Sequence, residues 1–230
     1  MVIVLIVLVA LFTGMIPGVT SPLGIGPNSQ VTASCGAGGS TGQTQGSDMS
    51  YCAARLRADA NVSSTSGGPW EFTSAVGVAD TMLNLFTCQN VSLQSAPQHA
   101  DLTTGLANFW KFVFVNSQGM ALVVAVVGPS LSRAVLVPTT NLLSCQMIST
   151  STINGSIIDS TEAASRAGLS SLPQPQNLLY VQYSLTYTPA YIPEPIWELT
   201  WDACLNGSYR GSQVVDAING DLLQGTSGSC

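Results

Sequence analysis

Residues 109–127 read FWKFVFVNSQGMALVVAVV, and this stretch predicts the centre of the fold. Its two runs of aromatic and β-branched residues, Phe109–Val115 and Met120–Val127, favour β-strands. The Asn-Ser-Gln-Gly sequence between them is typical of a hairpin turn. We therefore expect an antiparallel hairpin here, and we predict further strands over 178–188, 196–203 and 212–218.

Two other stretches have helical features. Residues 73–86 (TSAVGVADTMLNLF) place apolar residues three or four positions apart, as on one face of a helix. Residues 159–172 open with Asp159 and Glu162 in capping-box positions and continue with an Ala-rich body. We predict one helix over each stretch.

The second half of the chain repeats the pattern of the first. Trp110 begins a predicted strand, and Trp197 begins a similar strand 87 residues later. Near Thr73 and Ser160, the starts of the two predicted helices are also 87 residues apart. A single helix-plus-sheet unit would leave much of its apolar surface exposed, so we expect two units to pack together and form the core. The predicted fold class is α+β: two related helix-plus-antiparallel-sheet units over 69–150 and 151–230, after an apolar N-terminal segment and a Pro/Gly-rich linker.

Residues 1–16, MVIVLIVLVALFTGMI, form an uncharged apolar run. The run is shorter than the ~20 residues that span a bilayer as a helix. It also lacks the positive start of a signal peptide, since the first basic residue is Arg55. Its β-branched residues favour a strand as much as a helix, and an apolar N-terminal strand can complete the sheet of a neighbouring subunit.

Three interpretations of this run remain open: a signal peptide or membrane anchor, an assembly segment, and an ordinary buried strand or helix. We expect the run to be retained. The candidate assembly residues are Val2, Ile3, Val4, Leu5, Ile6, Val7, Leu8, Val9, Leu11 and Phe12.

Residues 17–46 are rich in Pro, Gly, Ser, Thr and Gln, a composition typical of linkers and loops. We expect a linker and a Cys-bounded loop over 17–68, which would let the apolar run lie away from the body of its own subunit. The alternative is a loop held against the body by a disulfide between Cys35 and Cys52.

Six cysteines and four Asn-X-Ser sequons indicate an exported protein at the cell surface or outside the cell. The cysteines are even in number and none has CxxC spacing, so disulfides in an oxidising compartment are favoured over metal sites. Pairing of sequence neighbours (35–52, 88–145, 204–230) is a hypothesis. The sequons are candidate acceptors of N-linked glycans. The disulfide candidates are Cys35, Cys52, Cys88, Cys145, Cys204 and Cys230, and the glycan candidates are Asn61, Asn90, Asn154 and Asn206.

Charged residues make up only 8% of the chain, against about 25% in an ordinary soluble protein. The surface is therefore neutral and rich in hydroxyl groups, and it should tolerate wide changes of pH because it depends little on ionised carboxylates. The six basic residues are scattered along the chain. Nucleic-acid binding needs clustered cations, so we do not expect it.

No residue pattern predicts catalysis, and we expect the protein not to be an enzyme and to bind no cofactor or metal. His99, which lies in a polar stretch, is the chain's single histidine. Glu198 and Asp202 would share one face of a strand but lie ~13 Å apart, too far for paired acid–base work. Trp110, Trp197 and Trp201 are expected in the core.

Three stretches of the second unit carry a resemblance to a known family: the Ala-rich 161–172, the aromatic start of 196–203, and the sequence Val-Asp-Ala-Ile-Asn-Gly-Asp at 215–221. In these stretches the unit resembles the PepSY family. The first unit has Val-Ala-Val-Val-Gly at 124–128 in the corresponding place, without the aspartate. The resemblance implies a small α+β fold with a helix on an antiparallel sheet, in secreted or cell-envelope proteins that bind or inhibit more often than they catalyse. We interpret Asp216 as a turn anchor rather than a catalyst.

In overall make-up the chain also resembles exported glycoproteins of heat- and acid-loving archaea, including subunits of their surface threads and pili. We therefore expect a structural subunit of an extracellular filament or cell-surface assembly, a homopolymer held together by burial of the N-terminal run in a neighbouring copy. The alternative is a PepSY-like binding or inhibitor module anchored in a membrane through residues 1–16. A weaker third reading is an accessory subunit of a membrane complex.

Overall fold

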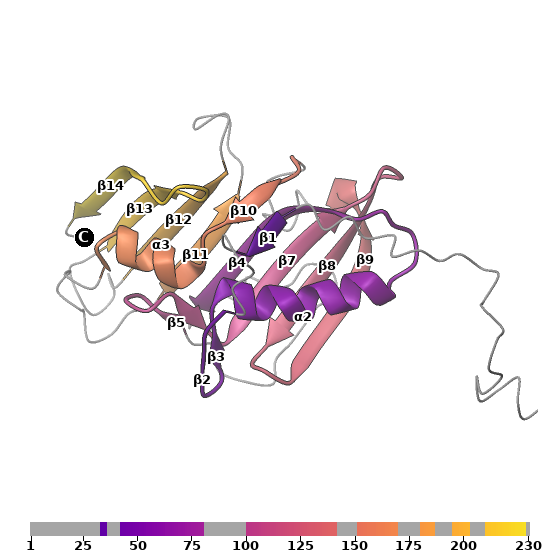
Figure 1. Cartoon of the computed structure of the whole chain (residues 1–230), viewed down its shortest axis with the longest axis horizontal. Helices are drawn as coiled ribbons and strands as arrows, with labels where there is room; N and C mark the ends of the chain where they lie inside the picture. The colour runs from indigo at the N-terminus through magenta and orange to yellow at the C-terminus, as the bar shows by residue number, and fades with distance from the viewer. Residues whose placement is uncertain are drawn as a thin grey trace, which may run out of the picture.

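The computed structural model of the chain describes residues 33–35, 42–80, 100–141, 151–169, 180–186, 195–202 and 210–228. Its main element is an antiparallel eight-stranded sheet with the strand order β14-β13-β12-β11-β4-β7-β8-β9 (Figure 1). In chain order these strands are β4 (Glu71–Asp80), β7 (Phe109–Val115), β8 (Met120–Val127), β9 (Leu131–Pro138), β11 (Tyr180–Thr186), β12 (Ile196–Asp202), β13 (Arg210–Asp216) and β14 (Leu222–Gly228).

Smaller elements surround this sheet. A second sheet has the order β2-β3-β6-β5, and β1 pairs with β10 in parallel. Two α-helices, α2 and α3, lie on the same side of the large sheet (Figure 1). The bounds are β1 (Ala33–Cys35), β2 (Thr44–Gln45), β3 (Asp48–Met49), α2 (Tyr51–Ser64), β5 (Ala100–Asp101), β6 (Leu106–Ala107), a 3-10 turn η1 (Thr139–Asn141), β10 (Gly155–Ile157) and α3 (Ser160–Arg166).

The strand order of the large sheet is symmetric about its middle. Strands β4, β7, β8 and β9 form one antiparallel meander after α2, and β11, β12, β13 and β14 form another after α3. The two meanders meet where β4 pairs antiparallel with β11. A single sheet therefore runs through both halves of the chain.

The predicted fold class was wrong. Antiparallel sheet dominates the described residues, with helices of only 14 and 7 residues. The two halves are not separate helix-plus-sheet units of PepSY type, because backbone hydrogen bonds between β4 and β11 join them into one sheet. The physical reason is that each meander leaves an open edge strand, and the two edges satisfy each other.

The predicted hairpin at 109–127 is confirmed. Strands β7 and β8 pair from Phe109 and Val127 to Val115 and Ala121. Asn116 closes the turn: its backbone N–H donates to the Met120 carbonyl, and its side-chain oxygen accepts from the N–H of Met120. Gly119 takes a φ of 73°, which explains glycine at this position.

The predicted helix over 73–86 was wrong, because residues 71–80 form strand β4 and the remainder lies outside the described residues. Side-chain burial in β4 follows from its place between β7 and β11. Gly77 lets the Trp110 ring lie against the strand, since an added Cβ would come within 2.7 Å of that ring. Pairing on both sides therefore overrides the helical spacing of the local sequence.

Helix α2 lies in the stretch expected to be linker and loop, which is a second correction. Ser50 caps it, with its side-chain oxygen accepting from the N–H of Ala53. The buried face carries Tyr51, Arg55, Ala58 and Val62, so a charged residue interrupts an otherwise helical apolar pattern. Helix α3 does begin after Asp159, as predicted, but it is shorter, and Glu162 pairs with Arg166 instead of the backbone.

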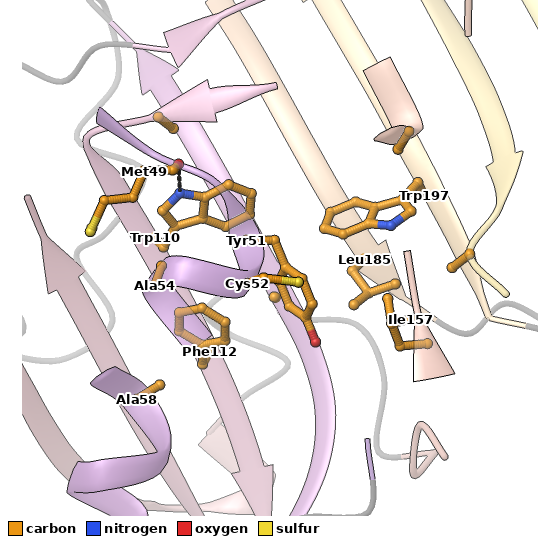
Figure 2. Packing of buried hydrophobic residues seen from close by; sticks show 14 of the residues in the cluster. Met49, Tyr51, Cys52, Ala54, Ala58, Trp110, Phe112, Ile157, Leu185 and Trp197 are labelled. Carbon is orange, nitrogen blue, oxygen red and sulfur yellow. Dashed lines mark hydrogen bonds between the residues drawn. The ribbon is translucent and has the colours of Figure 1, made fainter. Parts of the chain in front are cut away.

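One aromatic core joins the two halves. Tyr51 lies between Trp110 and Phe112 of the first half and Trp197 of the second (Figure 2), with its ring 6.1, 5.9 and 5.2 Å from theirs. Trp110 donates its Nε1–H to the Met49 carbonyl, just before the cap of α2. Trp197 donates in the same way to Ile158, just before the cap of α3. The predicted core positions of Trp110, Trp197 and Trp201 are confirmed, with at most 2% of each exposed.

The face of the large sheet away from the helices differs between its halves. On β7 and β8 it is buried and mostly apolar: Phe109, Val113, Val123 and Ala125 are at most 2% exposed, and Lys111 lies among them at 4%. On the other meander the same face carries the buried Ile196 and Val214 beside polar side chains that are half-buried or exposed: Glu198, Thr200, Ser212, Gln224 and Thr226. The apolar clusters on this second face therefore lie in the β9 half.

Candidate functional site

The starts of the two helices meet at the centre of the molecule. Ser160 accepts from the N–H of Tyr51 through its hydroxyl oxygen and donates to the Gly105 carbonyl. Asp159 accepts from the N–H groups of Cys52 and Ser160, at 2.9 and 2.8 Å. The start of α3 thereby supplies acceptors for two N–H groups in the first turn of α2, so this polar cluster fixes the joint between the two halves.

Burial raises the pKa of three acidic groups in this region. It raises the pKa of Asp159, against the opposing effect of hydrogen bonds from Ser50, Cys52 and Ser160. It also raises the pKa of Asp59, which receives the Nε–H of Arg55 at 2.7 Å, and it raises the pKa of Tyr51 to about 12.

The Arg55 guanidinium is 2% exposed and stacks on Phe72 at 3.9 Å from the ring centroid. The group holds α2 on the sheet by a cation–π contact and an ion pair. Its partners are the buried Tyr51, Phe72 and Phe114 and the half-buried Asp59, so we assign it a structural role.

A disulfide between Cys35 and Cys52 ties β1 to the first turn of α2, with the two Cα atoms 5.4 Å apart. This is the first of the three neighbour pairs suggested by the sequence. The bond holds β1 beside β10, on the helix side of the sheet. Cys88, Cys145, Cys204 and Cys230 lie outside the described residues.

Strand β9 is the candidate functional site, because it ends the large sheet and pairs only with β8 among the described residues. The pairing runs without a break over eight positions, from Met120 and Pro138 to Val127 and Leu131. An edge of this length and regularity can accept a further strand through its free backbone groups.

The ladder indicates which backbone groups point outward. Thr139 donates its N–H to Gly119, which continues the β8–β9 ladder by one pair. Hydrogen-bonded pairs alternate in an antiparallel ladder, so residues 137, 135, 133 and 131 bond to β8. The N–H and C=O groups of Ser132, Ala134 and Leu136 therefore point away from β8. Pro138 belongs to the same outward set, where its missing N–H costs no ladder bond.

Apolar side chains flank this edge on both faces of the sheet. Leu136 on the helix side is 47% exposed and Leu131 on the opposite side is 43% exposed. Val135 and Val137 continue the buried valine surface of β8. Arg133 is the one charged residue of β9. An added apolar strand would thus find apolar neighbours on either face.

The opposite edge, β14, is a poorer template. It also exposes leucines, with Leu222 at 53% and Leu223 at 44%. Its register with β13 shifts between Val214 and Val215, and glycines occupy positions 225 and 228. Glycine and a register shift both weaken a strand as a pairing surface.

Sequence reasoning did not identify β9. Its run Ala-Val-Leu-Val-Pro at 134–138 combines β-branched residues with a terminal proline, which together are the usual signal of an edge strand. The expected assembly residues, from Val2 to Phe12, lie outside the described residues, as do His99, Asn90 and Asn206. Asn61 lies in α2 and Asn154 just before β10.

The turn at 216–221 confirms the predicted role of Asp216 as a turn anchor. Asp216 accepts from the N–H groups of Ile218 and Asn219, so it anchors the turn, as its place in the sequence suggested. Glu198 lies on the face of β12 away from the helices, in register with Ser184 of β11 and Val214 of β13. The Glu198 carboxylate does not form an acid–base pair with another described side chain.

Within the described residues, no three or more His, Cys, Asp or Glu side chains are grouped as metal ligands would be. A search of the same residues finds no helix with the length and apolar character needed to cross a membrane.

Comparison with known proteins adds little. No protein-family model matches the chain, and no curated protein matches it. Among solved structures it is similar to the crystal structure of a "putative lipoprotein" from Clostridium difficile 630, with 9% sequence identity, a TM-score of 0.42, and coverage of 76% of this chain and 90% of that chain. This TM-score is too low to establish a shared fold.

Proposed function

We propose that the protein is a structural subunit of an extracellular filament or cell-surface assembly. In this assembly, residues 2–12 of one copy add as a strand to the β9 edge of the next copy. The observation that carries the proposal is β9 itself: an eight-residue regular edge strand with exposed leucines on both faces. The uncharged N-terminal run is a segment of matching length and chemistry.

The connection between the two parts has enough length. Residues 17–32 separate the run from β1, and a fully extended chain spans ~3.3–3.6 Å per residue, or about 55 Å for this stretch. Because the Cys35–Cys52 disulfide fixes the start of the body, the run has a defined origin from which to reach a neighbour. The cysteines and sequons support a location outside the cytoplasm.

Deleting residues 1–16 tests the proposal. The deleted protein should be a soluble monomer, whereas the full chain should sediment as polymers that are visible by negative-stain microscopy. Polymers that persist after the deletion would refute the proposal. A full-length chain that stays monomeric would refute it too, because its own run would then serve its own sheet.

A second proposal keeps residues 1–16 in a membrane and makes the body a binding or inhibitor module of the cell envelope. The absence of any charge in the run is the feature that favours it. Here the full chain should partition into detergent as a small species. Sedimentation as long polymers in the absence of lipid excludes this alternative.

A further inference from the structure

Two of the sequons, at Asn61 and Asn154, differ in the exposure and hydrogen bonding of their asparagine side chains. Asn61 is half-buried in the last turn of α2. Its Nδ2 donates to the Arg57 carbonyl at 2.9 Å and to the Ser132 hydroxyl of β9 at 2.8 Å. An asparagine amide nitrogen has two hydrogens, so both are in use.

An N-linked sugar on Asn61 would therefore conflict with the fold. The sugar replaces one of the two amide hydrogens, so one of these hydrogen bonds must be lost. The partner Ser132 lies on the edge strand, so the glycan would also sit against β9. Ser63, the serine of this sequon, donates its hydroxyl to the Asp59 carbonyl.

Asn154 has none of these constraints. It is exposed, and it lies in the irregular segment that leads into β10. Neighbouring groups hold this segment in place: Ile153 donates its N–H to Phe72, and Thr152 donates its hydroxyl to Glu71. The position is thus ordered by its neighbours while its own side chain makes no hydrogen bond within the described structure.

We infer that Asn154 is an N-glycosylated site of the folded protein and that the Asn61 sequon stays unmodified. The transfer forms a bond between Nδ2 of Asn154 and the anomeric carbon of a sugar. It breaks the bond from that carbon to a phosphate oxygen of an activated glycosyl donor, and the amide nitrogen gives up one proton. The sequon hydroxyl of Ser156 is buried in the folded protein, so transfer takes place before β10 pairs with β1. A chain that received a sugar on Asn61 at that stage would lose one of the two hydrogen bonds of this amide on folding, which disfavours a folded protein modified there.

The inference also explains how a glycan and the β9 edge coexist. β10 lies over the middle of the molecule and β9 at one end of the large sheet (Figure 1). A glycan at Asn154 leaves the edge accessible, whereas one at Asn61 would cover part of it.

Mass spectrometry of chymotryptic glycopeptides from the protein made in its natural host tests the inference. We expect a glycan mass on the peptide that contains Asn154 and the unmodified mass on the peptide that contains Asn61. An unmodified Asn154 overturns it, and so does a sugar on Asn61. This measurement does not depend on assembly, so it can fail while the filament proposal stands.

Two variants sharpen the test. Asn154→Gln should lower the mass of the intact protein by one glycan and leave the unfolding behaviour of the polypeptide intact. Asn61→Gln should leave the mass of the glycans unchanged and lower the unfolding temperature, because the amide no longer reaches both acceptors. A glycan loss in the Asn61→Gln variant would contradict the assignment.

Discussion

Substitution of Ala134 by proline should weaken assembly and leave the fold intact. Ala134 pairs with Val124 of β8, but its own N–H is one of those that point toward the free edge. Proline therefore removes a donor that no described residue of the subunit accepts. Pro138 already occupies an equivalent outward position, and the preceding Arg133 has the extended conformation that a following proline requires.

The expected magnitude follows from the ladder. An added strand loses one backbone hydrogen bond, worth about 1 kcal/mol net. The proline ring also stands where the incoming strand would approach, so we expect a total loss of about 1–3 kcal/mol per subunit contact. Since ~1.4 kcal/mol corresponds to a tenfold change in an equilibrium constant, the critical concentration for polymerisation should rise about 5- to 150-fold.

The assay is sedimentation over a range of total protein concentrations, with the supernatant giving the critical concentration. The free energy of unfolding, from denaturant titration of the monomer that lacks residues 1–16, should change by less than about 1 kcal/mol. An unchanged critical concentration in a variant of native stability would refute the assignment of β9 as the acceptor edge.

A matched pair of charge variants serves as control. Leu131 of β9 and Leu223 of β14 are exposed to nearly the same extent, 43% and 44%. Leu131→Lys should raise the critical concentration, because the added strand would bury a charge at that site, whereas Leu223→Lys should leave it unchanged. Equal effects of the two substitutions would indicate a general influence of net charge.

Two further predictions concern the joint between the halves. Asp159→Ala should lower the free energy of unfolding by about 2–4 kcal/mol, because α3 loses its cap and the buried N–H of Cys52 loses its acceptor. The control Glu162→Ala removes only an exposed ion pair on the same helix, so it should change the free energy of unfolding by less than about 0.5 kcal/mol. Denaturant titration measures the free energy of unfolding of both variants. The second prediction concerns pH. Burial raises the folded-state pKa of Asp59 and Asp159 above the ordinary value of 3.8, so the stability that these groups contribute is complete below that value and is lost as the pH rises through their raised pKa. Acidification from pH 7 toward pH 4 should therefore not destabilise the protein through these groups, as unfolding temperatures across this range will show; a steady fall in unfolding temperature that Asp159→Asn abolishes would contradict the sign.

The hairpin at 109–127 shows what local sequence can predict. Its strands are long, apolar and rich in β-branched residues, and its turn carries Asn116 and Gly119 at the positions that the geometry requires. Both signals act over a few neighbouring residues, so no distant contact is needed to interpret them. The bounds predicted for both strands agree with those of the structure.

Strand β4 and helix α2 show where local reasoning fails. The apolar spacing in 73–86 suits a helix, yet β7 and β11 on either side make a strand the better solution. In α2, Arg55 occupies a buried position because Asp59, Tyr51 and Phe72 compensate its charge. No pattern in the flanking Gly- and Ser-rich sequence predicts that these side chains compensate the charge of Arg55.

The sequence by itself determined the hairpin and the cap at Asp159, since each depends on residues that are neighbours along the chain. It also determined that the tryptophans are buried, because their large apolar rings favour the core wherever the chain places them. Only the tertiary structure decided that β4 joins β11 and that β9 ends the sheet. Strand order depends on contacts between segments far apart in the chain, and an edge strand differs from a central strand by its neighbours rather than by its composition. The candidate acceptor edge therefore became visible only once the whole sheet was assembled.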